Sequence, residues 1–499
     1  MSFLSLDFLL AAALALLVFY ALPLAWRPGF LLAASLAFFA LAGPVYLPLV
    51  ILLTWADFLL AGRMPASRPS GRKRLLWLGL LLNVGVLGFF KYTLWLNSLL
   101  GAFLPDGGRG LAAFRGGLLL PLGLSYFIFK KISYLLDAYW GRLQPEKRFS
   151  RLLLFVVFFP EITAGPIDRA GRLLPQFEGN RDFVAADISA GLHQVLWGMF
   201  KKLVIADRLA ALVDPVFQSP GQFQAQAILA AALFYSLQIY ADFSGYSDMA
   251  IGLGRLFGYR LQMNFDRPYF ALSIGDFWRR WHISLSQWLR DYLFLPLSFA
   301  FLRRFPQASL LGRKTEAQAY ALASLVTMAL CGLWHGASWT FLLWGLLHGV
   351  YLAAGFFSRR ARRRVKKRLG IAGHSAWNRS WQQLSTFLLV SLAWILFRSE
   401  SLSGALDMFA RLLSPAGWFS GRARGLAEWS GAAGQAEFAV ALAAVGALFL
   451  VETLQGRWRI GRALRSLQWP LRWAAYYLFI LAVLFFGVFS KAEFVYQGF

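Results

Sequence analysis

The chain has 499 residues, of which 58% are hydrophobic and only 15% are charged, whereas about a quarter of the residues in a soluble domain are charged. This composition excludes an ordinary soluble protein and predicts an all-α polytopic membrane protein. Fifty Lys and Arg against 24 Asp and Glu give a net charge of +26. The basic residues gather in short breaks between apolar runs, as membrane topology requires, so we do not expect nucleic-acid binding. The single cysteine, Cys331, excludes an internal disulfide.

Apolar runs recur along the whole chain. In chain order they are 3–22, 30–42, 44–61, 75–100, 117–139, 151–160, 184–213, 225–257, 318–333, 339–357, 383–397, 436–454 and 473–490. A simple span needs about 20 apolar residues, so 151–160 and the region 240–300 predict re-entrant or broken helices instead. We expect ten to twelve full crossings. Because no solenoid period or paired halves are visible, we expect one membrane-embedded domain over 1–499.

Three basic segments predict the orientation. They occupy 63–74, 359–368 and 457–472, and the positive-inside rule places them in the cytosol. Counting spans outward from them puts both termini on the outer face, with residues 491–499 as an extracytoplasmic tail. No Lys or Arg precedes the first apolar run, so we interpret that run as a span rather than a cleaved signal.

Polar residues interrupt the apolar sequence in three places, and such residues are costly in a membrane and mark function by default. The stretches are 240–248 with 264–269, then 277–292, and then 332–339. Besides two histidines, His282 and His335, the candidate binding residues in them are Asp242, Ser244, Asp248, Asn264, Trp278, Arg279, Arg280, Trp334 and Ser338.

His335 is the sharpest catalytic candidate because it lies in a Gly-flanked break, where an imidazole can take a proton from a hydroxyl. A hydrogen bond that ties two helices together is the equally weighted structural alternative for a membrane histidine. His282 follows two arginines, which favours a structural or anion-orienting role. For His348, inside an apolar run, packing and a hydrogen bond are favoured.

Metal binding and thiol catalysis are the weaker alternatives. The histidines and carboxylates show no ligand spacing such as His-Glu-x-x-His, so no metal is predicted. Cys331 lies four residues before His335 and would share a helix face with it, which makes a Cys–His nucleophile conceivable. A buried cysteine is far more often a small hydrophobic residue.

Four boxes in one order give a specific resemblance. They are Phe158-Phe-Pro-Glu-Ile-Thr-Ala-Gly-Pro-Ile-Asp-Arg169, Asp242-Phe-Ser-Gly-Tyr-Ser-Asp248, Trp278-Arg-Arg-Trp-His282 and Leu333-Trp-His-Gly336. The chain resembles the membrane-bound O-acyltransferases, and within them the bacterial branch that acetylates alginate, peptidoglycan and cellulose. It departs from relatives at Pro296-Leu-Ser-Phe299, where they usually read Pro-Leu-Gly-Gly.

The resemblance implies a ring of tilted helices around a central tunnel, with the candidate polar residues lining it. It also implies that His335 and His282 are the family's catalytic pair. The reaction would carry acetyl from a cytosolic thioester, acetyl-CoA or an acylated carrier protein, across a bacterial inner membrane to an exported polysaccharide. A secreted transferase of the SGNH or serine-esterase type would be the partner, and no permanently bound cofactor is expected.

The last residues, Phe494-Val-Tyr-Gln-Gly-Phe499, resemble the Phe-x-Tyr-x-x-Phe tail of such transferases. The implied role of Tyr496 is to accept the acyl group and pass it on. By composition alone, an aromatic tail is an interfacial anchor.

Two alternative functions remain at this stage. One is a lipid or protein O-acyltransferase. The other is a proton-coupled transporter without a covalent step, in which the histidines and carboxylates form a relay; the aromatic tail and the missing inverted repeat speak against it.

Overall fold

The structure is a computed structural model, and its chain forms two units. It describes residues 3–100, 121, 123–162, 165–179, 181–310, 313–371, 375–419, 423–431, 434–458 and 468–489. Unit 1 comprises the chain up to Val195 together with Ser247–Met263, and unit 2 comprises Leu196–Tyr246 together with the chain from Asn264 onward.

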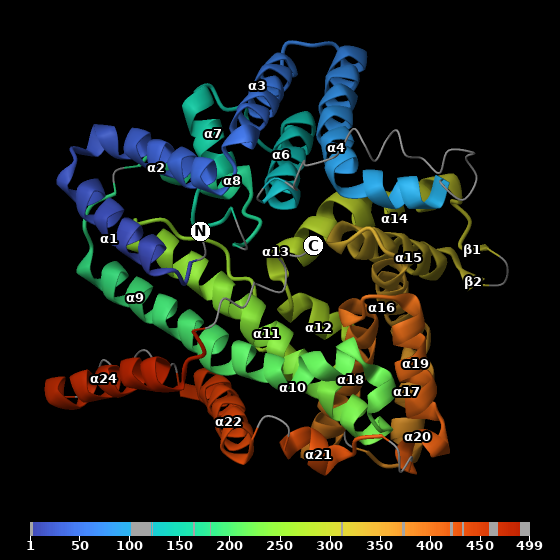
Figure 1. Ribbon diagram of the computed structural model, residues 1–499. Coiled ribbons are helices and arrows are strands. Elements are labelled where there is room, and N and C mark those ends of the chain that lie inside the picture. Colours follow the sequence, from blue (N-terminus) through green and yellow to red (C-terminus); the bar gives the residue numbers. More distant parts are fainter. Residues whose placement is uncertain are drawn as a thin grey trace. The chain divides into compact units, whose positions relative to one another are not determined.

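Unit 1 is helical (Figure 1). Its helices are α1 (Leu6–Ala21), α2 (Arg27–Ala42), α3 (Leu47–Arg63), α4 (Pro69–Leu100), α6 (Leu124–Tyr139), α7 (Phe149–Val157), α8 (Ala170–Leu173), most of α9 (Ala185–Met199) and the last turns of α11 (Ala225–Leu256). Short 3₁₀ turns cover Leu24–Trp26, Pro44–Tyr46 and Leu174–Phe177.

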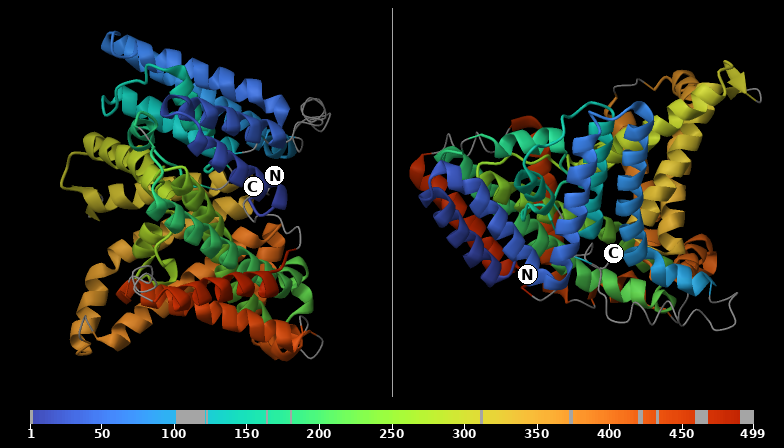
Figure 2. Two further views of the ribbon diagram at one scale, coloured as in Figure 1. Left: turned by 90° about the vertical axis from the view of Figure 1, so that its left-hand side faces the viewer. Right: turned by 90° about the horizontal axis from the view of Figure 1, so that it is seen from above.

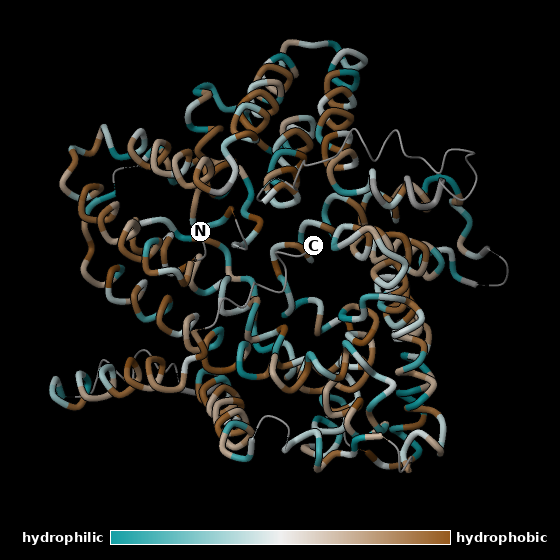
Figure 3. Tube along the Cα trace, in the orientation of Figure 1, coloured by the Kyte–Doolittle hydropathy of each residue, from teal (hydrophilic) through white to brown (hydrophobic). Residues whose placement is uncertain are grey.

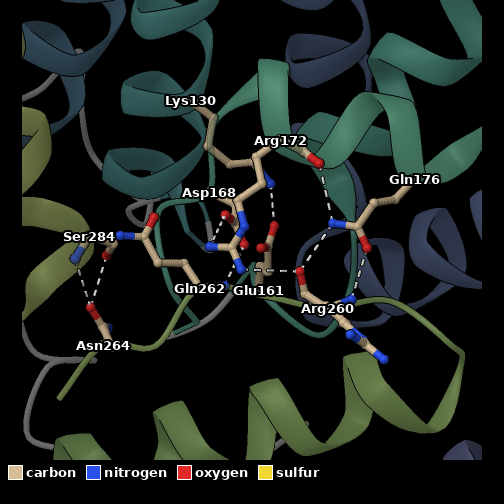
Figure 4. A network of polar contacts seen from close by, with 9 residues as sticks. All are labelled: Lys130, Glu161, Asp168, Arg172, Gln176, Arg260, Gln262, Asn264 and Ser284. Atoms are coloured by element: carbon tan, nitrogen blue, oxygen red, sulfur yellow. Dashed lines mark hydrogen bonds and ion pairs between the residues drawn. The ribbon is translucent and has the colours of Figure 1, made fainter. Parts of the chain in front are cut away.

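Buried charges cross-link these helices. Lys131 of α6 lies 3.3 Å from an Asp57 oxygen on α3, and Asn83 of α4 donates to both oxygens of the same carboxylate at 3.0 Å. The neighbouring Lys130 pairs with Glu161 (Figure 4). All four charged side chains are buried. A buried charge is tolerated only when it is paired, so these contacts fix how the three helices pack.

The described part of unit 2 is helical apart from a short antiparallel β-hairpin. In it the strand β1 (Ser309–Leu310) pairs with the strand β2 (Arg313–Lys314). Its helices, besides the first part of α11, are α10 (Asp207–Gln218), α12 (Ile274–Arg280), α13 (Ile283–Leu289), α14 (Leu295–Arg304), α15 (Thr315–His335), α16 (Trp339–Phe357), α17 (Arg359–Arg368), α18 (Ala376–Arg398), α19 (Leu402–Leu413), α20 (Pro415–Phe419), α21 (Leu426–Gly431), α22 (Gln435–Trp458) and α24 (Trp469–Phe486). Two π-helical segments, Phe200–Ala206 and Arg290–Phe294, and 3₁₀ turns at Pro220–Gln222 and Pro268–Phe270 complete it.

Helices α15 and α16 lie side by side in an antiparallel hairpin (Figures 1 and 2). Glycines let their backbones touch: a Cβ added to Gly345 would lie 2.1 Å from the carbonyl oxygen of Met328, and one on Gly332 would lie 2.1 Å from that of Phe341. Small residues allow such close approach between membrane helices, where van der Waals packing drives association. The hairpin therefore holds its connecting turn, which follows His335, in a fixed place.

Nine helices of the described residues are long and apolar enough to cross a membrane. They cover Leu24–Leu41, Pro44–Arg63, Pro69–Thr93, Ala225–Leu256, Thr315–His335, Trp339–Phe357, Ala376–Arg398, Gln435–Gln455 and Trp469–Phe486. In Figure 3, brown marks the hydrophobic residues along α3 and α22. The shorter apolar helix Leu6–Ala21 is the next candidate, so the nine fall one short of the ten to twelve crossings expected from the sequence. The chain is a multi-pass membrane protein.

One expectation about helix continuity needs correction. The region 240–300 is not broken throughout, because α11 runs without interruption from Ala225 to Leu256; the breaks come after it. Within the run 184–213, a π-helical segment joins α9 to α10. Ser298 and Phe299, which replace the usual Gly pair, lie inside α14, so no glycine-dependent turn is needed there.

Candidate active site

His282 lies in unit 2, at the junction of α12 and α13. Its backbone is left-handed, with φ 42° and ψ 56°, a conformation that histidine tolerates better than most side chains but that costs about 1–3 kcal/mol. The turn is held by backbone bonds: Ser286 N donates to the His282 carbonyl at 2.9 Å, and Ile283 N donates to the Asn264 carbonyl at 2.8 Å. The ring is completely buried.

Asn264 is the hydrogen-bond partner of this imidazole. Its Oδ1 lies 3.0 Å from His282 Nδ1 and also accepts from Ser284 Oγ at 2.9 Å and Ser284 N at 3.3 Å; Figure 4 shows the contacts to Ser284. Burial lowers the pKa of His282 to about 3, because a buried imidazolium loses its hydration. His282 is therefore neutral, which argues against an anion-orienting role and leaves a hydrogen-bonding one.

His335 is the last residue of α15, directly before the turn at Gly336. It is buried, and its ring packs edge to face on Trp334 and Trp344, with centroids 4.8 Å and 5.3 Å away. The ring of Trp334 also lies 6.1 Å from that of His282. The two histidines, 53 positions apart in the sequence, thus share one tryptophan between them. The ring of Phe243 in α11 also contacts that of His282, with centroids 4.6 Å apart.

His348 belongs to the aromatic surroundings of this site. Its Nδ1 accepts a hydrogen bond from Trp278 Nε1 at 3.2 Å, and its ring contacts that of Trp344 at 5.0 Å. The expectation of packing and a hydrogen bond for His348 is confirmed. Trp278, a predicted binding residue, acts here as the donor that fixes a neighbouring ring.

A buried charge cluster lies along α11. Lys202 Nζ is 2.8 Å from Asp242 and 2.7 Å from Asp207, and Lys201 Nζ donates to Ser244 Oγ at 2.9 Å. Burial acts to lower the pKa of Lys202, but the two carboxylates outweigh it, so the pKa is raised and the amine stays charged. Two adjacent lysines inside the apolar run 184–213 were the signal that sequence reasoning passed over.

The remaining predicted residues that the structure describes have contacts of their own. Arg279 is largely exposed and pairs with Asp276. Arg280 pairs with Asp276 and Asp266. Ser338 caps α16 by accepting from Phe341 N at 3.3 Å. Asp248 belongs to unit 1, where it accepts from Gln194 at 3.2 Å. Tyr496 and the rest of the tail lie outside the described residues.

The arrangement of these side chains suits proton transfer and does not resemble a set of metal ligands. A neutral, oriented imidazole and a second buried histidine both lie against the ring of Trp334. Among the residues that the structure describes, no three His, Cys, Asp or Glu side chains gather as a metal site would require. A buried imidazole can accept the proton of an attacking hydroxyl away from bulk water, which would otherwise hydrolyse an activated acyl group.

Comparison with known proteins identifies the family. Residues 71–372 match the model of the MBOAT, membrane-bound O-acyltransferase family. A probable alginate O-acetylase of Azotobacter vinelandii is 37% identical over 408 residues, which cover 80% of this chain and 75% of that protein. A peptidoglycan O-acetyltransferase of Helicobacter pylori is 35% identical over 405 residues, covering 76% and 72%.

A more distant relative is a teichoic acid D-alanyltransferase of Bacillus subtilis, 30% identical over 250 residues, which cover 49% of this chain and 61% of that protein. The four sequence boxes and the nine apolar helices among the described residues agree with these matches. The chain belongs to the membrane-bound O-acyltransferase family and is a multi-pass membrane O-acyltransferase.

Proposed function

We propose that this protein takes an acetyl group from a cytosolic thioester and moves it across a bacterial inner membrane for O-acetylation of an exported polysaccharide. The observation that carries the proposal is the pair of buried histidines around Trp334 in a multi-pass chain. The names of the relatives, alginate O-acetylase and peptidoglycan O-acetyltransferase, support acetyl as the group and a cell-envelope polymer as its destination.

In the proposed reaction, a hydroxyl oxygen attacks the carbonyl carbon of the thioester. His335 takes the hydroxyl proton, the C–S bond breaks, and the departing thiolate receives that proton from the imidazolium. Acetyl-CoA is the expected donor, with an acylated carrier protein as the alternative. His335 can play this part because it ends α15 at a break in the helix, where its buried ring packs against the rings of Trp334, Trp344 and Phe397.

The C-terminal tail is the proposed acceptor of the acetyl group, through Tyr496. The described end of the chain contacts the π-helical segment, where Val488 N donates to the Leu203 carbonyl at 3.0 Å. The preceding residue, Lys202, binds Asp242 of α11, and the ring of the adjacent Phe243 contacts that of His282. Six residues lie between Phe489 and Tyr496, so the seven Cα–Cα steps span roughly 23 Å when extended. This reach supports access of the tyrosine to the site.

We further propose that the helices surround a tunnel that joins the cytosol to the outer face, with both termini outside. Segments 63–74, 359–368 and 457–472 would then lie in the cytosol; the basic helix α17, which has no buried residue, supports this for the second of them. An esterase-like secreted transferase would take the acetyl group from the tail and pass it to the polymer.

The test is reconstitution of the full chain in lipid vesicles with radiolabelled acetyl-CoA. The expected result is labelled acetyl on the protein that is released to a hydroxyl acceptor, and no labelling for His335→Ala at equal protein. Acetylation of a lipid instead of a soluble saccharide acceptor would favour the lipid acyltransferase alternative. Failure of the intact protein to take label from acetyl-CoA or an acetylated carrier protein would overturn the proposal.

A further inference from the structure

The tautomer of His282 follows from the atoms around Asn264. Ser284 N can only donate a hydrogen bond, and it lies 3.3 Å from the Asn264 side-chain oxygen. The opposite orientation of the amide would set an NH₂ group against this N–H, so the oxygen must be the atom that faces residues 282–284. His282 Nδ1, 3.0 Å from the same oxygen, must therefore be the donor.

A neutral imidazole has one N–H, so a proton on Nδ1 leaves Nε2 with a free lone pair. Nε2 of His282 is buried, and no hydrogen-bond partner lies within reach of it among the residues that the structure describes. Buried polar atoms are normally satisfied, and an acceptor without a partner in a site invites an explanation in terms of a ligand. The rings of Phe243 and Trp334 contact that of His282, so the imidazole lies among aromatic side chains.

Asn264 also fixes where this lone pair is presented. Its side chain binds His282 and Ser284, and its backbone carbonyl binds Ile283 N. Asn264 thus forms hydrogen bonds with three consecutive residues, 282–284, the first of which has the left-handed backbone. Asn264 is itself completely buried, so its side chain has no solvent-facing role. Its geometry determines both the position and the protonation of His282.

We infer that Asn264 is a positioning residue that holds the ring proton of His282 on Nδ1, so that Nε2 accepts a hydrogen bond from an N–H or O–H group of the substrates. The inference rests on the proposed function for the identity of those substrates. Thioester donors built on pantetheine carry amide N–H groups, and the acceptor carries a hydroxyl. Both are donors of the kind that a neutral imidazole nitrogen accepts.

The first experiment reads the tautomer directly and needs no activity. The chain holds five histidines, so nitrogen NMR of the protein labelled with ¹⁵N-histidine gives few signals, and His282→Gln identifies those of residue 282. The expected spectrum shows Nδ1 protonated and Nε2 unprotonated from pH 8 down to pH 5. In Asn264→Ala the preference for Nδ1 should be lost, while Ser284→Ala, which keeps the backbone donor, should resemble the wild type.

A proton on Nε2 of His282 in the wild-type protein, or an unchanged spectrum in Asn264→Ala, would overturn the inference. Asn264→Asp keeps the shape and the acceptor oxygen, and it separates loss of the hydrogen bond from loss of the fold. The added negative charge should raise the pKa of His282, so its titration should move upward toward neutral pH. An unaltered titration in a folded Asn264→Asp protein would also contradict it.

Kinetics then distinguish the two sources of the donor group. If Nε2 binds an amide of the thioester, Asn264→Ala should raise KM for acetyl-CoA by about three- to tenfold with little change in kcat. If it binds the acceptor hydroxyl, kcat should fall by a similar factor while KM for acetyl-CoA stays constant. No change in either constant would refute the role in substrate binding. A wild-type protein that transfers no acetyl would refute the proposed function instead, and the NMR result would stand.

Discussion

His335 and Trp344 pack edge to face, with ring centroids 5.3 Å apart and ring planes at 86°. His335 ends α15 and Trp344 lies one turn into α16, so their contact exists only because the two helices approach closely. Gly332 and Gly345 allow that approach. The position of the proposed base therefore depends on residues that have no chemistry of their own.

Replacement of His335 by alanine should lower acetyl transfer by about 10²–10⁴-fold, the usual contribution of a general base. Membrane insertion should be intact, because the change lies at a helix end. Cys331→Ser is the matched control: this residue is buried one turn earlier in α15, and its loss should be nearly silent. Ester-bound acetate on the polymer is the measurement. Loss of acetyl transfer in Cys331→Ser would restore the hypothesis of a cysteine nucleophile. Normal acetyl transfer by His335→Ala would show that His335 is not the general base.

Gly345→Leu should separate α15 from α16 and displace His335. A Cβ at this position would lie 2.1 Å from a backbone oxygen that cannot move aside, and overpacking typically costs 1–3 kcal/mol or more. We expect a lower melting temperature in detergent together with lost activity. Gly355→Ala, on the same helix with no atom within 4 Å of the added Cβ, should be as stable as the wild type or slightly more so. Equal melting temperatures for both variants would contradict the close packing.

Lys202→Met should destabilise the protein strongly. It leaves the carboxylates of Asp207 and Asp242 buried without their shared cation, and removal of one partner from a buried ion pair costs about 3–5 kcal/mol. The control is Arg290→Gln, which removes a largely exposed partner of Asp291 and should cost under about 1 kcal/mol. Thermal unfolding followed by tryptophan fluorescence checks this. Partial recovery of stability in the double variant Lys202→Met, Asp242→Asn would show that the unpaired carboxylate causes the destabilisation. Equal destabilisation by Lys202→Met and Arg290→Gln would argue against a buried charge cluster.

Cysteine labelling tests the proposed sidedness. In a Cys331→Ser background, Arg362→Cys and Arg465→Cys should react with an impermeant thiol reagent only after spheroplasts are permeabilised, because basic segments are retained in the cytosol. Lys491→Cys, in the tail, should react without permeabilisation. The inverse pattern would show that the orientation is reversed.

Tyr496→Phe keeps the aromatic ring of the tail and removes only its hydroxyl, so it separates a relay from an interfacial anchor. We expect normal insertion, no acetylated polymer, and an acetyl group on Tyr496 of the wild-type protein by mass spectrometry when the secreted partner is absent. A phenol has a pKa near 10, so at neutral pH it needs a nearby base to act as nucleophile. Wild-type acetylation by Tyr496→Phe would reduce the tail to an anchor and favour direct transfer from the thioester to the partner.

The sequence by itself determined the membrane class, the approximate spans and the family, because hydropathy is a local sum and the boxes are contiguous. It also placed His335 in a Gly-flanked break between two apolar runs, and the structure shows that α15 continues up to His335 before it ends. The tertiary structure decided what the polar residues do. In a π-helical segment, two adjacent lysines contact Ser244 and Asp242. Such a change in helical period cannot be predicted from the average hydropathy of the sequence. Asn264 meets His282 across 18 positions through a left-handed turn. Asp248, only six residues after Asp242, belongs to the other unit. Which nitrogen of His282 carries the proton depends on one oxygen from a distant part of the chain, and only folding brings that oxygen there.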